Sequence, residues 1–247
     1  MTLRRWNIAV GQFFFKRRNA LFPVAILLTI LCLRPHVLFG NPAIDRWLMR
    51  AGVATALAGE CVRLVTIGFE YIDRGGKEGK VYASALVQGG VYALTRNPMY
   101  VGNMLIVTGV TMVSGSPSAY VILIPGFLFI YQAIIAAEEE YLRAKFGADY
   151  NAFCADVPRF FPALRHLRRA FADRRYRWRY AVRKELSTMA GLFTGLMLLP
   201  VWRLYFLQGV TAAQRAFPPA AACAASILIL YGFFVYLKRR RLLFYAE

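Results

Sequence analysis

Six apolar stretches, each about as long as a membrane-spanning helix, dominate this sequence of 247 residues. A helix needs about 20 mostly apolar residues to cross the roughly 30 Å of hydrocarbon in a bilayer. Hydrophobic residues make up 58% of the chain, a larger share than is usual in a soluble domain. The sequence therefore predicts an all-α, polytopic integral membrane bundle of about six transmembrane helices, at Ala20–Phe39, Trp47–Phe69, Met99–Ser116, Ala119–Ala137, Leu186–Leu207 and Pro219–Leu237.

The first stretch has the features of a retained signal anchor. Arg17 and Arg18 precede it like the charged start of a signal peptide, Arg34 and Pro35 interrupt it, and no small-residue cleavage site follows. The third and fourth stretches are joined by the uncharged turn Ser114–Ser118, which predicts a tight antiparallel hairpin.

Basic residues predict the orientation. In a six-span arrangement, 25 of the 31 Lys and Arg residues fall on one side of the membrane. By the positive-inside tendency, both termini are expected to be cytoplasmic. The net charge of +18 points to anionic lipid headgroups as partners and not to nucleic acid, because the basic residues flank apolar spans and form no recognisable nucleic-acid module.

The basic segment before the fifth span suggests contact with the membrane surface. Its arginines alternate with aromatic residues, which could stack on bases. However, its apolar residues fall near one helical face, as in a helix that lies in the interface: Leu164, Leu167, Phe171, Trp178 and Val182.

The four cysteines and two histidines show no spacing typical of a metal site. Cys32, Cys61, Cys154 and Cys223 are far apart in the chain and are expected to be unpaired thiols with structural roles. No metal site is predicted.

Polar residues gather at the start of the third span. Asn97 is a favourable N-cap and proline is favourable at the first helical position, so local structure accounts for Asn97 and Pro98. Local structure does not account for two tyrosines, an arginine and a glycine near the same helix start, namely Tyr92, Tyr100, Arg96 and Gly102. Together they predict a pocket at the cytoplasmic side.

Acidic residues at the end of the fourth span divide by helical geometry. Glu138 shares a face with the apolar residues of that span and is expected to point inward. Glu139 is placed to pair with Arg143, four residues on, although all three glutamates of 138–140 could equally form a solvated helix end.

A second charged pair lies within the second span. Glu60 and Arg63 are three residues apart and share one face. Because isolated charges in a bilayer are costly, they are either a structural ion pair or residues that line the acceptor pocket.

Residues 84–162 resemble the isoprenylcysteine carboxyl methyltransferase family and, more loosely, the membrane phospholipid N-methyltransferases. The resemblance rests on the ordered motifs at 90–93, 96–102, 138–142, 146–150 and 157–158. Such enzymes hold S-adenosylmethionine near the cytoplasmic ends of helices and not on a Rossmann sheet.

The resemblance implies roles for individual residues. It implies cofactor-binding residues at Ser84, Ala85, Leu86, Val87, Tyr92, Asn97, Pro98, Met99, Tyr100 and Gly102. The first four would contact the adenosine part through the main chain, and Tyr92 would lie against it. Asn97, Pro98 and Tyr100 would cradle the amino acid part. The resemblance also implies that Glu138 sits at the substrate side. Glu138 and Arg96 are the catalytic candidates, and the charged pair of the second span, Arg63 and Glu60, is expected together with Glu138 to bind the substrate.

Two positions depart from the family pattern. Asn97 stands where the family usually has histidine. Ile134 stands where the isoprenylcysteine enzymes carry a substrate-binding arginine, so a carboxylate acceptor need not be held in the same manner. The prediction is thus a membrane methyltransferase that uses S-adenosylmethionine and acts on a lipid or other hydrophobic acceptor.

Two alternatives remain at this point. Sterol-type membrane reductases, which use NADPH, share the Arg-x-x-x-Tyr-x-Gly element and a similar ending at 153–158. A non-catalytic membrane scaffold or carrier is the other possibility.

The chain is treated as one membrane domain, residues 1–247, with a methyltransferase-like core at 84–162 and an additional helix pair at 186–237. In this pair, Gly191 and Gly195 form a small-xxx-small face suited to close helix packing. Glu185 is expected to interact with the dipole at the start of the fifth span. The oligomeric state cannot be predicted.

Overall fold

A computed structural model describes residues 3–70, 85–172 and 174–240, and all regular structure in these ranges is helical. This confirms the predicted all-α class. The elements are α1 (Leu3–Cys32), η1 (Leu38–Gly40), α2 (Pro42–Phe69), η2 (Gly90–Ala93), α3 (Pro98–Ser114), α4 (Pro117–Asp156), η3 (Leu164–His166), α5 (Leu167–Phe171), α6 (Trp178–Gln208) and α7 (Val210–Arg239).

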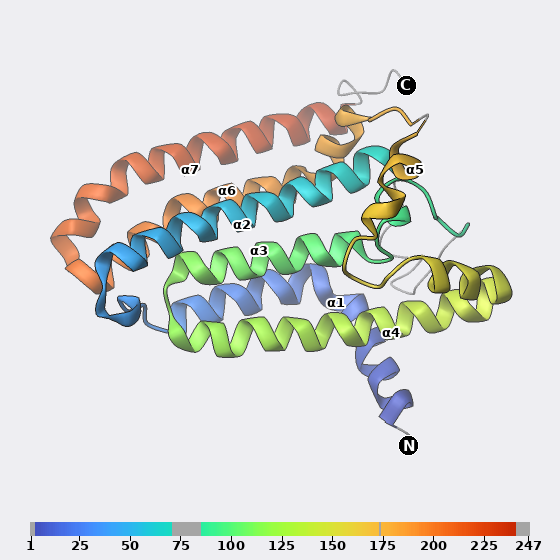
Figure 1. The fold of residues 1–247 in the computed structure, drawn as a ribbon. Helices are drawn as coiled ribbons and strands as arrows, with labels where there is room; N and C mark the ends of the chain where they lie inside the picture. The colour runs from blue at the N-terminus through green and yellow to red at the C-terminus, as the bar shows by residue number, and fades with distance from the viewer. Residues whose placement is uncertain (1–2, 71–84, 173, 241–247) are drawn as a thin grey trace.

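The long helices run side by side along one axis (Figure 1). Helix α2 packs mainly on α3 and also on α6, α1 packs on α4, and α7 packs on α6. Both termini lie at the same end of the bundle as η2 and α5 (Figure 1). The predicted polar motifs therefore gather at this end.

Four of the described helices are long and apolar enough to cross a membrane, namely α2, α4, α6 and α7. Helix α3 is apolar but has only 17 residues. Helix α1 has 30 residues, but Lys16, Arg17 and Arg18 interrupt its apolar sequence. It ends at Cys32 and not at the predicted Phe39. The protein is thus a multi-pass helical bundle, although only four of the six expected spans meet the length and composition of a full span.

Glycines allow α2 and α3 to approach closely. A Cβ on Gly59 would lie 2.6 Å from the carbonyl oxygen of Gly102, and one on Gly52 would lie 2.8 Å from that of Gly109. The two glycines of each helix are seven residues apart in sequence, which places them on the same face of that helix. By contrast, no described atom lies within 4 Å of a Cβ at Gly191 or Gly195, so the close packing predicted for α6 occurs between α2 and α3.

The predicted hairpin between the third and fourth spans is present. Helix α3 ends at Gly115, which has a positive φ of 63°, a conformation that glycine adopts without steric cost. Helix α4 begins two residues later with Ser116 as its N-cap, and the hydroxyl oxygen of Ser116 accepts a hydrogen bond from the Ala119 N–H at 3.4 Å.

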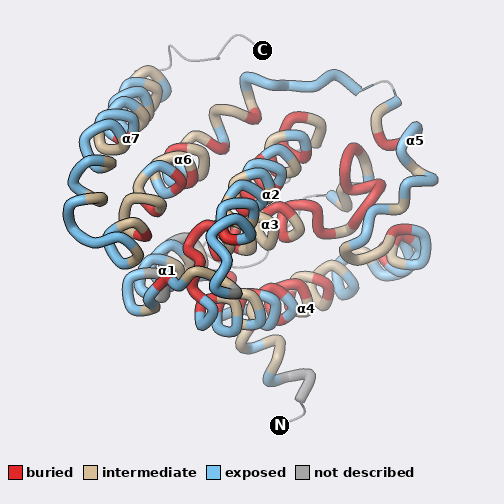
Figure 2. Tube along the Cα trace, turned by 60° about the vertical axis from the view of Figure 1, so that its left-hand side comes forward, coloured by how far each residue is buried: buried red, intermediate tan, exposed pale blue. Residues whose placement is uncertain are grey.

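Buried residues concentrate on α2, α3 and α4, whereas α7 is exposed along almost its whole length (Figure 2). Its exposed side chains are mostly apolar, including Leu228, Ile229 and Phe233. Such a surface suits contact with lipid tails.

The basic segment does not form the single interfacial helix predicted for residues 164–182. It contains η3 and the five-residue α5, and α6 begins only at Trp178. Contacts with the end of α2 account for the interruption. The Arg177 N–H donates to the Gly68 carbonyl at 2.9 Å, and the ring of Tyr176 packs against that of Phe69 with a centroid separation of 5.1 Å.

Candidate active site

The start of α3 is tied to the segment that follows α4. Pro98 occupies the first turn, as predicted, but the Asn97 side chain forms no capping hydrogen bond. Its Nδ2 donates instead to the Arg159 carbonyl at 3.2 Å, and the Thr95 hydroxyl donates to the same carbonyl at 3.0 Å. The Arg96 N–H donates to the Pro158 carbonyl at 2.9 Å. The Val157-Pro158-Arg159 motif thus holds the start of α3 in place through these hydrogen bonds.

Tyr100 and Glu138 meet directly between α3 and α4. The Tyr100 hydroxyl donates to Glu138 Oε1 at 2.7 Å, and the ring packs against Tyr131 with a centroid separation of 5.2 Å. From α1, Arg18 Nη1 donates to the Tyr100 oxygen at 2.9 Å and lies 3.8 Å from Glu138 Oε1. The guanidinium also lies over the Phe15 ring, 4.2 Å from its centroid. Three helices therefore contribute to one polar contact.

Glu139 is buried, with an exposed fraction of 7%, and the prediction that it pairs with Arg143 is wrong. It lies between two other arginines: Arg96 Nη1 is 3.2 Å from its Oε1, and Arg159 binds both carboxylate oxygens, with Nε at 3.0 Å. Arg143 instead lies 4.0 Å from Glu140.

Glu139 stabilises the charged guanidinium of Arg159 and also binds Arg96. The hydrogen bond with Glu139 raises the pKa of the Arg159 guanidinium, because it favours the charged form. Arg96 Nη1 additionally contacts Cys154 Sγ at 2.6 Å. Arg96, a predicted catalytic residue, therefore links the segment before α3 to α4 through Glu139 and Cys154.

Three other predicted cofactor residues are held by protein packing. Tyr92 is buried within η2. Met99 packs with Ile67 of α2 and Ala181 of α6. Gly102 lies on the face of α3 that packs against α2, where a Cβ would come within 2.6 Å of Arg63 Cγ.

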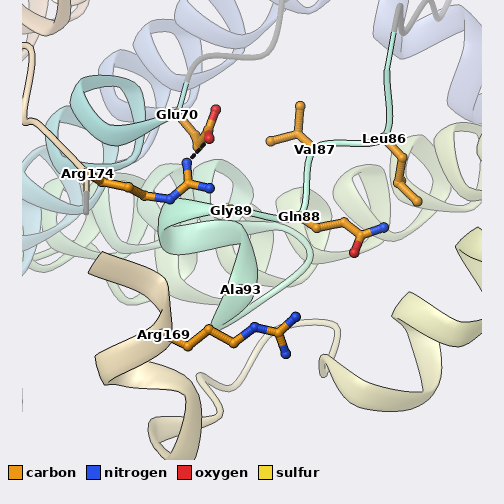
Figure 3. A pocket seen from close by; sticks show the side chains of 8 residues that line it. All are labelled: Glu70, Leu86, Val87, Gln88, Gly89, Ala93, Arg169 and Arg174. Carbon is orange, nitrogen blue, oxygen red and sulfur yellow. Dashed lines mark hydrogen bonds and ion pairs between the residues drawn. The ribbon is translucent and has the colours of Figure 1, made fainter. Parts of the chain in front are cut away.

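A cavity of about 430 Å³ opens beside η2 (Figure 3). Leu86 and Val87, both predicted to bind cofactor, line it. Ala85 is exposed and is not among the lining residues, and Ser84 lies outside the described residues. The remaining lining residues are Glu70, Gln88, Gly89, Ala93, Arg169 and Arg174.

An ion pair crosses the wall of this cavity. Arg174 Nη1 pairs with the Glu70 carboxylate, as the dashed line in Figure 3 shows. A Cβ on Gly89 would collide with the Arg174 guanidinium, so the absence of a side chain at this position allows the arginine to lie across the loop. The cavity combines aliphatic side chains with charged ones.

Glu60 and Arg63 share a face as predicted, and they belong to a separate buried cluster. Arg63 Nε donates to Glu185 Oε2 at 3.1 Å and lies 3.7 Å from Glu60 Oε2. The guanidinium also bonds Asn103 and the Thr188 hydroxyl, the latter at 3.3 Å. Neither carboxylate oxygen of Glu60 has a hydrogen-bond partner among the described residues.

The role predicted for Glu185 is wrong. Helix α6 begins at Trp178, so Glu185 lies well inside the helix and pairs with Arg63 of α2 rather than with a helix dipole. This cluster joins α2, α3 and α6, whereas the Tyr100–Glu138 contact joins α1, α3 and α4.

The sequence did not identify Arg18, Glu70, Arg169 or Arg174 as site residues. All four are arginine or glutamate in strongly charged segments, and their role depends on contacts between helices far apart in the chain. Within the described part of the chain, no group of three or more His, Cys, Asp or Glu residues could hold a metal ion. Cys32, Cys61, Cys154 and Cys223 are free thiols.

The fold and the site together define a multi-pass helical membrane protein whose predicted polar motifs lie at one end of the bundle. Residues 51–149, which are 99 of the 247, match the model of the family described as phospholipid methyltransferase. This match confirms the resemblance to the isoprenylcysteine carboxyl methyltransferase-like superfamily. It supports a membrane methyltransferase.

Two curated relatives match part of the chain. The cobalt-zinc-cadmium resistance protein CzcN of Cupriavidus metallidurans is 32% identical over 81 residues, which are 33% of this chain and 37% of the relative. The nickel-cobalt-cadmium resistance protein NccN of Alcaligenes xylosoxydans xylosoxydans is 28% identical over 124 residues, 49% of this chain and 54% of the relative. The chain thus spans about a third to a half of these relatives. No solved structure matches.

Proposed function

We propose that this protein is a membrane-embedded methyltransferase that uses S-adenosylmethionine and methylates a lipid or other hydrophobic acceptor. The observation that carries the proposal is the hydrogen bond of 2.7 Å between Tyr100 and Glu138. It joins the two motifs of the segment that matches the methyltransferase family. A hydroxyl and a carboxylate held together at the end of membrane helices are suited to handling a proton of an acceptor.

The cavity beside η2 fits the cofactor. Its volume of about 430 Å³ suits a nucleoside with an attached amino acid, within the range of small-molecule sites. Leu86 and Val87 provide an apolar surface for the adenosine part, and Glu70, Gln88 and the arginines provide polar groups. When bound, S-adenosylmethionine supplies an activated methyl group on a sulfonium.

The protein's own residues would orient the acceptor and manage its proton. The Glu138 carboxylate can accept a proton or a hydrogen bond from an O–H, N–H or S–H group of the acceptor. The Tyr100 hydroxyl can donate a hydrogen bond to the acceptor's O, N or S atom. Arg18 Nη1 lies 3.8 Å from Glu138 Oε1 and can balance the negative charge of that carboxylate. Methyl transfer would replace the bond from sulfur to methyl by one from the acceptor to methyl, and Glu138 or water would take the acceptor proton.

The membrane topology supports an acceptor that arrives from the bilayer. Tyr100 and Glu138 lie on α3 and α4, which are apolar helices. The cavity is lined by residues of η2, α5 and the segment before η2, and η2 and α5 lie at one end of the bundle (Figure 1). We propose that this end is cytoplasmic, because its flanking segments carry most of the Lys and Arg residues. These charges would attract anionic lipid headgroups.

Methyl incorporation tests the proposal. Purified protein in lipid nanodiscs would be incubated with S-adenosylmethionine labelled on the methyl group and with a lipid extract, and the label in the organic phase would be counted. We expect incorporation that falls strongly in Tyr100→Phe and Glu138→Gln. The matched control is Glu140→Gln on the same helix, whose carboxylate pairs with Arg143.

Two results would contradict this function. Binding of NADPH without any response to S-adenosylhomocysteine in calorimetry would indicate a reductase of the sterol type. Unchanged ligand binding and no label uptake in the wild type and in both variants would indicate a scaffold or carrier.

A further inference from the structure

The cavity beside η2 carries one positive charge that no lining carboxylate balances. Of its charged residues, Glu70 pairs with Arg174, which leaves Arg169. In Figure 3, Arg169 extends from α5 and lies apart from the Glu70–Arg174 pair. The cavity therefore favours a ligand with an anionic group on the side of α5.

Among the described residues, the carboxylate that faces Arg169 is that of Asp156, which does not line the cavity. Arg169 Nη1 lies 3.9 Å from Asp156 Oδ2, beyond hydrogen-bond distance. Asp156 is in closer contact with Arg165 at 3.5 Å and with His166 at 3.2 Å. Within the described parts of the chain, the Arg169 guanidinium therefore has donors that can bind a further anion.

The backbone that carries Arg169 is firmly placed. The neighbouring Ala170 has no exposed surface and packs with Ala93 and Leu94. Ala93 itself lines the cavity. The Arg169 side chain therefore projects from a helix whose backbone is already packed on the cavity wall, so a ligand bound there would order the side chain without having to order the backbone.

We propose that Arg169 binds the carboxylate of the cofactor's amino acid part. This inference rests on the proposed function. The carboxylate is the one anionic group of S-adenosylmethionine, and a guanidinium can bind it with two parallel hydrogen bonds. Leu86 and Val87 then hold the adenosine part of the same ligand. Arg169 lies outside residues 51–149, so a segment beyond the family match completes the cofactor site.

This placement differs from the one implied by the resemblance, in which Asn97, Pro98 and Tyr100 hold the amino acid part. In the structure, the Asn97 amide bonds the Arg159 carbonyl, and the Tyr100 hydroxyl bonds Glu138. With the carboxylate on Arg169, Tyr100 and Glu138 remain for the acceptor.

Calorimetry with two ligands tests the role of Arg169. S-adenosylhomocysteine has the carboxylate, and 5′-methylthioadenosine has the same nucleoside and a thioether but no amino acid part. Loss of hydrogen bonds to a charged group corresponds to a fall in affinity of about tenfold to hundredfold. We expect Arg169→Gln to weaken S-adenosylhomocysteine by that factor and to leave methylthioadenosine unchanged, with partial recovery in Arg169→Lys.

The matched control is Arg168→Gln, which removes the same charge from the neighbouring position of α5. Arg168 is exposed and does not line the cavity, so both affinities should stay at the wild-type value. Arg169 is itself 77% exposed at the side chain, and the fold should tolerate its replacement.

Three outcomes would overturn the inference: equal weakening of both ligands by Arg169→Gln, an equal effect of Arg168→Gln, or wild-type protein that binds both ligands equally tightly. Binding of neither ligand to the wild type would instead reject the proposed function, so the two failures are distinguishable.

Discussion

Replacement of Arg63 by methionine should destabilise the bundle strongly, because it would leave two buried carboxylates without their cation. Glu60 and Glu185 each have an exposed fraction of 3%. Arg63 supplies the hydrogen bonds to Glu185, to Asn103 and to Thr188. Methionine keeps a flexible stem of similar length, so the main change is the loss of the charge and its donors.

The expected magnitude follows from this burial. Removing one partner of a buried ion pair costs about 3–5 kcal/mol, and a domain of this size loses about 2–4 °C in midpoint per kcal/mol. We therefore expect the thermal midpoint to fall by roughly 10 °C. The midpoint can be measured in detergent or nanodiscs by circular dichroism.

A double variant separates the charge effect from packing. Arg63→Met combined with Glu185→Gln removes the cation together with one of the carboxylates that it pairs with. The double variant should therefore lose less stability than the sum of the losses of the two single variants. Arg50→Met is the control, because Arg50 is exposed on the same helix, and it should shift stability by at most about 0.5 kcal/mol. A loss below about 1 kcal/mol for Arg63→Met, or strictly additive losses, would refute the proposed electrostatic role.

Three further perturbations test other parts of the structure. Tyr100→Phe keeps the ring packing but removes the hydroxyl, and it should slow methyl transfer about 100-fold while S-adenosylhomocysteine affinity, measured by calorimetry, changes little. Glu139→Gln should lower the free energy of unfolding by about 1–2 kcal/mol, a modest loss because the contact with Arg159 is partly exposed. The pKa of Arg159 is raised above its ordinary value, so the stability from this shift is present throughout the neutral and mildly alkaline range and is lost only at strongly alkaline pH. The difference between wild type and Glu139→Gln should then stay constant between about pH 7 and 11 in thermal unfolding, and a decline within that range would contradict this. Gly59→Ala should cost about 1–3 kcal/mol because its Cβ would meet backbone at 2.6 Å, whereas Gly191→Ala should be tolerated; equal midpoints for the two variants would argue against the close packing of α2 and α3.

Local sequence features predicted the elements well. The apolar runs predicted α2, α4, α6 and α7, and the Ser114–Ser118 turn predicted the hairpin, because hydrophobic length and turn chemistry act within a few residues. The same local view failed for α1, in which charged residues sit inside a continuous helix. It also failed for the basic segment 164–182, where contacts with α2 override the amphipathic pattern.

The partners of the charged residues were largely beyond local inference. Helical spacing placed Glu138 toward the interior, and it does contact Tyr100. The same spacing assigned Glu139 to Arg143, but the tertiary fold brings Arg159 and Arg96 to it. An ion pair with a neighbour on the helix surface is worth little in water, so the arginines that another segment brings to the buried Glu139 carboxylate determine the outcome.

The sequence by itself determined that this chain is a multi-pass helical membrane protein with methyltransferase motifs, because apolar length and motif order are properties of contiguous residues. Only the tertiary structure decided which charges meet. Arg63 reaches Glu185 across 122 residues, Arg18 reaches Tyr100 across 82, and Arg169 reaches the cavity from beyond the family match. Such contacts depend on how helices pack against one another, and in a medium that cannot solvate charge each buried ionic group must find its partner wherever that packing places it.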